Sequence, residues 1–100
     1  MLIAFALTPM GVEENVADYV ADAVKIIRES GLRTRSDSMY TMVEGEWDEV
    51  MDVVKRATEA VAAKAPRVQL ILKADLWPAM TNPLDGKIAL LEQRITEVES

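Results

Sequence analysis

The hydrophobic residues of this chain are spaced in two ways, and the alternation between them constrains the fold more than any other feature. A period of two residues, typical of a strand, occurs in four segments, 2–8, 32–39, 40–44 and 68–73. A period of about 3.6 residues, typical of a helix, occurs at about 16–29 and 46–64 and again after Asp85. The order strand, helix, strand therefore occurs twice, which predicts a ferredoxin-like α+β sandwich with an additional C-terminal helix.

Residues that commonly end or cap elements lie between these segments. Asn15 is expected to cap the first helix, with Glu13 and Glu14 at the positive end of the helix dipole. Ser30-Gly31 is expected to stop that helix. We interpret Pro9-Met10-Gly11 as a break after the first strand, which predicts that the strand ends at Thr8.

The four expected strands differ in how much of their surface is apolar. Residues 2–8 are apolar on both faces, which predicts a central strand, whereas 32–39 is polar and charged and predicts an edge strand. The ferredoxin-like topology places the first and third strands in the middle and both main helices on one face. Apolar groups on the other face predict that something covers it: a second subunit, a ligand, or the last helix or the Trp77 loop folding back.

The two later helices are each expected to bury one apolar stripe. In the second helix the stripe consists of Trp47, Val50, Met51, Val54, Ala57 and Val61. An ion pair between Asp52 and Arg56 is expected on its opposite side. The last helix is expected to be capped by Asp85 and to bury Ile88, Leu91, Ile95 and Val98.

Composition excludes several classes of chemistry. The 100 residues contain neither Cys nor His, which removes disulfides, thiol nucleophiles, zinc ribbons and imidazole catalysis and leaves no cofactor or metal indicated. A net charge of -6 argues against nucleic-acid and anionic membrane partners and favours a cationic ligand. The longest apolar run, 2–7, is too short to cross a bilayer and lacks the flanks of a signal peptide. We therefore expect one domain over 1–100, cytoplasmic, that binds rather than catalyses.

The densest acidic segment runs from Glu44 to Asp52. Glu46, Asp48 and Glu49 are explained by the positive end of the second helix. Glu44 differs, because it ends a central strand and needs a cationic or hydrogen-bonding partner there. That partner is either Arg33 or Arg35 on the neighbouring strand, or a ligand.

Two tryptophans are open to more than one interpretation. The helical spacing of Trp47 favours packing in the core over a binding role. Trp77 lies in an expected loop, which favours an interface or a stacking surface. By strand alternation, Thr41 faces away from Glu44, so the two are not expected to share a pocket.

Several segments, taken in order, resemble the small thiamine-binding protein family. They are Leu7-Thr8-Pro9-Met10-Gly11, the Glu29-Ser30-Gly31 helix end, Thr41-Met42-Val43-Glu44-Gly45-Glu46-Trp47-Asp48, Lys73-Ala74-Asp75 and Gly86-Lys87. The resemblance implies a cytoplasmic ferredoxin-like protein that associates through its sheets into dimers and tetramers, with a pocket for thiamine or its hydroxymethylpyrimidine part. The chain has Leu76 and Trp77 where the family often has a basic residue, which puts contacts from that loop in doubt.

The resemblance also implies roles for particular side chains, since thiamine joins a thiazolium cation to an aminopyrimidine. Glu44 would accept from the amine or pair with the cation, and Trp47, Tyr40 or Trp77 would stack on a ring. Hydroxyl groups are available from Thr41, Ser36 and Ser38, and Met10 and Met39 would form apolar walls. The alternative function is an oligomeric interaction or regulatory module without a physiological thiamine ligand.

Overall fold

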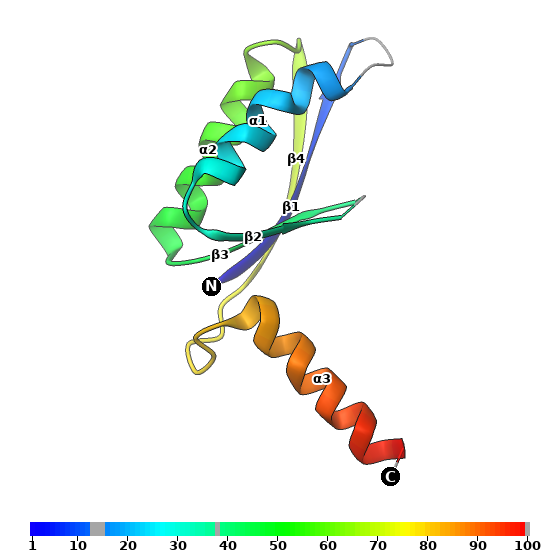
Figure 1. Cartoon of the computed structure of the whole chain (residues 1–100). Coiled ribbons are helices and arrows are strands. Elements are labelled where there is room, and N and C mark those ends of the chain that lie inside the picture. The colour runs from blue at the N-terminus through cyan, green and yellow to red at the C-terminus, as the bar shows by residue number, and fades with distance from the viewer. Residues whose placement is uncertain (13–15, 38, 100) are drawn as a thin grey trace.

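The chain forms a four-stranded antiparallel sheet with two helices packed on one face (Figure 1). The computed structural model describes residues 1–12, 16–37 and 39–99. Its elements are β1 (Leu2–Met10), α1 (Ala17–Glu29), β2 (Arg33–Ser36), β3 (Thr41–Glu44), α2 (Trp47–Ala62), β4 (Arg67–Asp75) and α3 (Pro83–Glu99). The strand order is β2-β3-β1-β4, so the predicted ferredoxin-like arrangement, with the first and third strands central and the polar second strand at an edge, is confirmed.

The first strand is longer than predicted. β1 pairs with β3 from Leu2 to Phe5, but it pairs with β4 as far as Met10. The expected break at Pro9 is therefore wrong, because proline is tolerated in a strand where its missing N–H is not needed by a neighbour. The strand ends instead before Gly11, which has a φ of +74° that L side chains rarely adopt.

The helix limits agree with the stop signals in the sequence. α1 ends at Glu29, followed by Ser30 and by Gly31 with a φ of +78°. The Ser30 hydroxyl donates to the Ile27 carbonyl at 2.7 Å and accepts from the Leu32 N–H at 3.2 Å. The expected cap Asn15 and its neighbours Glu13 and Glu14 lie outside the described residues.

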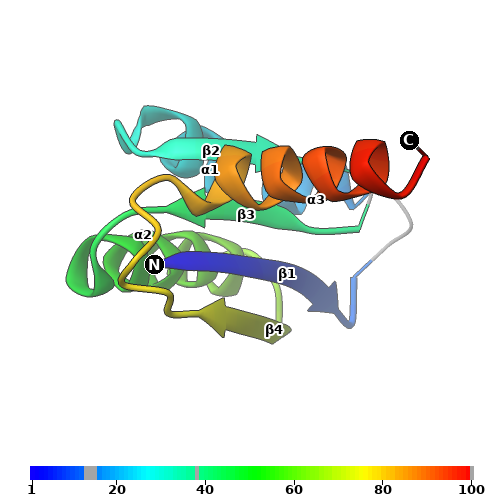
Figure 2. The same cartoon turned by 90° about the horizontal axis from the view of Figure 1, so that it is seen from below.

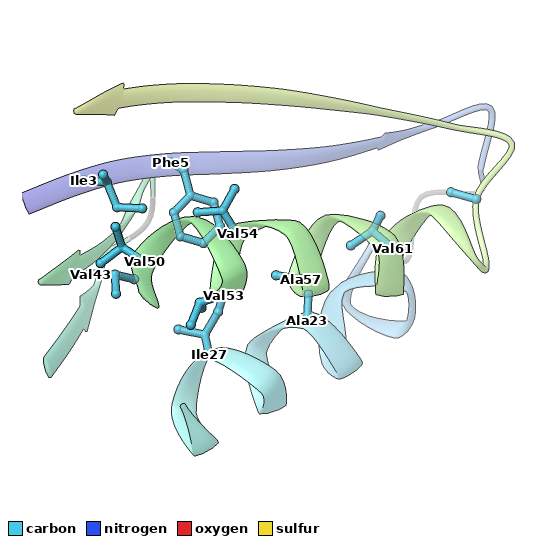
Figure 3. Close-up of a cluster of buried hydrophobic side chains, with 11 residues drawn as sticks. Ile3, Phe5, Ala23, Ile27, Val43, Val50, Val53, Val54, Ala57 and Val61 are labelled. Atoms are coloured by element: carbon cyan, nitrogen blue, oxygen red, sulfur yellow. The ribbon is translucent and has the colours of Figure 1, made fainter. Parts of the chain in front are cut away.

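The hydrophobic core lies between the sheet and the two packed helices (Figure 3). Its buried members come from β1, β3, α1 and α2 and from the turn after α2: Ile3, Phe5, Ala23, Ile27, Val43, Val50, Val53, Val54, Ala57, Val61 and Ala65. The predicted stripe of α2 is buried at Val50, Val54, Ala57 and Val61, whereas Trp47 is 56% exposed. Trp47 is wrong as a core residue because it is the first residue of the helix, beyond the stretch that packs on the sheet.

The C-terminal helix does not complete the sandwich. α3 starts beside the sheet face opposite α1 and α2 and then runs away from the sheet (Figures 1 and 2). Leu84 is buried in the first turn, but Ile88, Leu91, Ile95 and Val98 are all more than 40% exposed. Their predicted burial is wrong within this chain, because past the first turn the helix runs clear of the sheet.

Asp85 lies inside the first turn of α3 rather than capping it, since the helix begins at Pro83. None of the helices in the described part of the chain is both long enough and apolar enough to cross a bilayer.

Candidate functional site

A cavity of about 260 Å³ opens between α1, β1 and the segment that joins β2 to β3. Its walls are mostly apolar side chains of the two packed elements, including Phe5, Leu7, Val20, Ala23, Val24 and Ile27. Three of the residues singled out from the sequence, Met39, Tyr40 and Thr41, also line it, and Asp37 is the fourth from that segment. The structure therefore brings residues with a phenol ring, a thioether, an aliphatic hydroxyl group and a carboxylate to one cavity beside an apolar wall.

Asp37 supplies the charge of this first cavity. Its Oδ1 accepts the backbone N–H of Tyr40 at 2.8 Å and of Met39 at 2.7 Å. These hydrogen bonds, that of Tyr40 first, hold the pKa of the Asp37 carboxyl below its ordinary value. The group is therefore ionised at neutral pH. Sequence reasoning missed Asp37 as a site residue, although an Asp that accepts from N–H groups two and three positions on is a common turn signal.

A second cavity, of about 290 Å³, lies next to the first. It shares the lining residues Val24, Ile27 and Thr41 with the first cavity and adds Arg28, Thr34, Arg35 and Ser36. The hydroxyl oxygens of Ser36 and Thr41 are 3.2 Å apart, within hydrogen-bond distance. Ser36 and Thr41 are thus the predicted site residues at the second cavity, whereas Ser38 lies outside the described residues.

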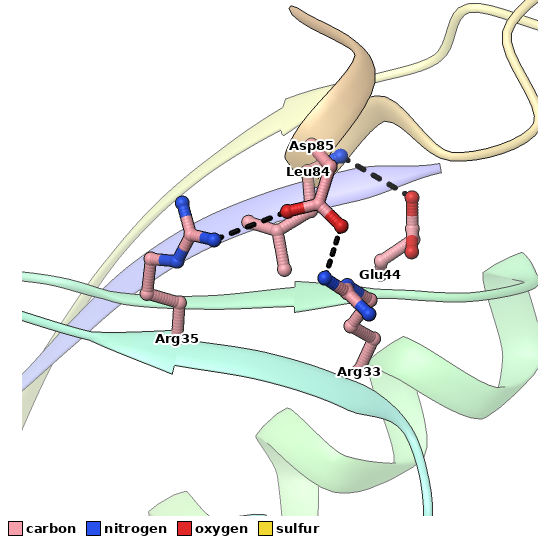
Figure 4. A network of polar contacts seen from close by, with 5 residues as sticks. All are labelled: Arg33, Arg35, Glu44, Leu84 and Asp85. Carbon is pink, nitrogen blue, oxygen red and sulfur yellow. Dashed lines mark hydrogen bonds and ion pairs between the residues drawn. The ribbon is translucent and has the colours of Figure 1, made fainter. Parts of the chain in front are cut away.

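The remaining predicted site residues lie elsewhere. Met10 ends β1 opposite Arg67, and Trp47 starts α2 with its ring largely exposed. Glu44 ends β3, where its Oε1 accepts the backbone N–H of Leu84 at 3.2 Å (Figure 4). None of these three side chains lines either of the two cavities.

The two arginines that were one alternative for the partner of Glu44 pair with a different residue. Arg33 and Arg35 both form ion pairs with Asp85 in the first turn of α3, the latter at 3.1 Å (Figure 4). Of the two alternatives left open for Glu44, the internal pair with Arg33 or Arg35 is therefore not found among the residues that the structure describes. The reason is that Arg33 and Arg35, two positions apart, point to the same sheet face, where the start of α3 presents Asp85 between them.

The loop between β4 and α3 presents apolar side chains to solvent. Leu76 and Trp77 are both exposed, and the Trp77 carbonyl accepts the N–H of Met80 at 3.0 Å in a turn. This exposure agrees with a surface role for Trp77. Trp77 lines neither of the two cavities.

Comparison with known proteins finds matches along most of the chain. Residues 3–92 match the family described as "Thiamine-binding protein", a span that includes every residue lining the two cavities. A UPF0045 protein of Mycobacterium bovis is 45% identical over 100 residues, covering 99% of this chain and 98% of the relative.

Solved structures match in fold as well. A domain of unknown function from Bacillus cereus is 32% identical with a TM-score of 0.79, covering 87% of this chain and 85% of that chain. A hypothetical protein of Methanocaldococcus jannaschii is 25% identical with a TM-score of 0.83, covering 91% and 94%. Sequence, strand order and solved neighbours agree, and the chain belongs to the thiamine-binding protein family.

Proposed function

We propose that this chain is a non-catalytic, cytoplasmic protein that binds thiamine or its hydroxymethylpyrimidine moiety, and that the ring occupies the first cavity. The observation that carries the proposal is the Asp37 carboxylate, held ionised in a mostly apolar cavity that Tyr40 also lines. Membership of the thiamine-binding family supports the choice of ligand.

The chemistry of the cavity suits a flat cationic or amine-bearing heterocycle. Apolar walls would remove the faces of the ring from water, and Tyr40 offers a plane for stacking. Asp37 offers negative charge and an acceptor for an exocyclic amine, and Thr41 offers a hydroxyl group. The cavity is slightly smaller than the roughly 300 Å³ at which pockets for drug-sized ligands begin, a size that fits one ring better than two.

The contacts proposed in this chain are Met39, Tyr40 and Thr41 with Asp37, and Ser36 from the adjoining cavity. Glu44, Trp47 and Met10 lie outside both cavities, so the proposal does not depend on them.

Isothermal titration calorimetry with thiamine and with hydroxymethylpyrimidine tests the proposal. Asp37→Asn keeps an oxygen that can accept from Met39 and Tyr40 while removing the charge, and we expect it to weaken thiamine binding about tenfold. Glu29→Gln is the matched control, because it removes the same charge from the exposed end of α1 and lines neither cavity. Equal affinity of Asp37→Asn and Glu29→Gln would remove Asp37 from the site, and absence of heat with both compounds would contradict thiamine binding.

We also propose that the chain acts as a homo-oligomer. The supporting observation is the row of exposed apolar residues on α3, which continues from buried Leu84 through Ile88, Leu91 and Ile95 to Val98. Alternating steps of four and three residues are the spacing by which helices pack against one another, and a second copy would present the same row.

This surface also supports the second candidate function, an interaction module whose assembly is its role. The two candidates differ in whether a ligand is retained. Native mass spectrometry of freshly purified protein reports the number of subunits and any bound small molecule in one measurement. An assembly that carries no ligand and gives no heat with thiamine would favour the interaction module.

A further inference from the structure

The two adjoining cavities carry opposite charges. Asp37 is the charged residue among those that line the first cavity. The second cavity is lined by Arg28 and by three residues with hydroxyl groups, Thr34, Ser36 and Thr41. No carboxylate lines the second cavity within residues 1–12, 16–37 and 39–99. The chain as a whole has a net charge of -6, so the positive charge of the second cavity is opposite in sign to that of the chain.

Of the two arginines that line the second cavity, Arg28 is the one available to a ligand. Arg35 also lines it, but Arg35 is opposite Met42 in the sheet, whereas Thr34 and Ser36 alternate to the other face and Ser36 is opposite Thr41. The guanidinium of Arg35 points instead to Asp85 on the open face (Figure 4). Arg28 lies in the last turn of α1, and in the described part of the chain no ion pair includes it.

The hydroxyl groups add neutral donors beside this cation. Ser36 and Thr41 are 3.2 Å apart, so one hydroxyl donates to the other and one hydroxyl hydrogen of the pair is left to donate elsewhere. Thr34 carries a third hydroxyl on the same face of β2. A guanidinium together with hydroxyl donors is the set that recognises the oxygens of a phosphate group.

We propose that the second cavity binds the phosphate of a phosphate monoester whose ring occupies the first cavity. The inference rests on the proposed function and names the form of the ligand: thiamine monophosphate rather than free thiamine. In thiamine monophosphate the phosphate is attached through a two-carbon arm to the cationic thiazolium ring, so opposite charges lie on neighbouring parts of one molecule. The shared wall of Val24, Ile27 and Thr41 lets a single ligand span the two cavities, with its cation toward Asp37 and its phosphate toward Arg28.

Calorimetry of thiamine and thiamine monophosphate against the same protein tests the proposal. We expect the wild type to bind the phosphate ester about tenfold more tightly than thiamine. Arg28→Gln should abolish that preference and leave the affinity for thiamine within about twofold of the wild type, because the exposed Arg28 side chain does not line the first cavity. Lys25→Gln is the matched control, since it removes one positive charge from the same helix at an exposed position that lines neither cavity.

A phosphate ester that binds no more tightly than thiamine would overturn the proposal. The same holds if Arg28→Gln and Lys25→Gln reduce the preference equally, because the effect would then come from net charge and not from a site.

A titration with inorganic phosphate, followed by the amide NMR signals of Thr34, Ser36 and Thr41, separates this proposal from thiamine binding. Signals that move in the wild type and not in Arg28→Gln support the anion site. If thiamine gives no heat in the same protein, that result overturns only the proposed function. Signals that stay unmoved while thiamine binds overturn the anion site and leave the proposed function intact.

Discussion

The two faces of the sheet differ in how far this chain alone covers them. On the face that carries α1 and α2, Ile3, Phe5 and Val43 are almost completely buried. On the opposite face, Ile71 is 58% exposed and only the start of α3 meets the sheet. One face thus has a buried core at the centre of the sheet, whereas the other exposes apolar surface of the kind that marks a contact with another molecule.

The largest expected effect is the loss of stability when the covered face is hollowed out. Phe5→Ala removes a ring that is 2% exposed, and we expect it to lower the free energy of unfolding by about 3–5 kcal/mol. Ile71→Ala on the open face should lower it by less than about 1 kcal/mol at protein concentrations low enough to keep the chains apart. Urea denaturation measures both values, and equal losses would break the contrast between the faces.

The next effect concerns assembly. Leu91→Glu places a charge within the exposed row of α3, and we expect it to dissociate the oligomer without changing the helical content. Gln93→Glu adds the same charge on the opposite side of the helix, so it should leave the assembly intact. Analytical ultracentrifugation measures the mass of each variant. Wild type and Leu91→Glu sedimenting alike as single chains would contradict the role proposed for α3.

At the rim of the covered face, Asp37 has a lowered pKa in the folded chain. The contribution of its hydrogen bonds to stability is present above the ordinary pKa of an aspartate and is lost as the pH falls through the lower folded value. We therefore expect the amides of Met39 and Tyr40 to exchange faster in acid, beyond the intrinsic change in rate, and this acceleration to be absent in Asp37→Asn.

Asp22→Asn is the control for this experiment. The pKa of Asp22 is also lowered, but by its hydrogen bond and ion pair with Lys64, 2.7 Å away. Its replacement should leave the exchange of the two turn amides unchanged. An acid dependence that persists in Asp37→Asn would show that another group governs the turn.

The smallest effect is expected where α3 joins the open face. Asp85→Asn weakens the ion pairs with Arg33 and Arg35, which are exposed and worth about 0.2–1 kcal/mol each. Hydrogen exchange should show faster opening of the first turn of α3, with little change in the core of α2. The difference from wild type should shrink in high salt. A difference that is insensitive to salt would assign the attachment of α3 to the burial of Leu84 instead.

The covered face could be predicted from the sequence because its signals are local. The period of the α2 stripe and the alternation along β1 report burial directly, and Ser30-Gly31 marks a helix end by backbone geometry. The stripe of α3 also recurs at helical spacing, although less regularly than that of α2, but a period shows only that a face is apolar. It does not show whether the partner of that face belongs to the same chain.

The candidate site was harder to predict for a similar reason. Thr41 and Tyr40 were singled out, and the structure places them at the cavities, but Glu44 and Trp47 at the other end of the same strand and turn are not there. Which end of β3 borders a cavity depends on how far β1 and α1 extend beyond it, and this is a property of packing. Asp37 was missed because its role depends on the turn that it stabilises.

The unequal pairing of β1 has a consequence for aggregation. Residues 2–5 lie between two partner strands, whereas residues 6–10 pair with β4 and leave their other edge without β3. An open edge of this kind can recruit the strand of another molecule and begin a fibril. Pro9 lies in that stretch and has no amide hydrogen to offer an incoming strand. A central strand of this sheet thus carries the protection against misassembly that proteins usually place on their outermost strands.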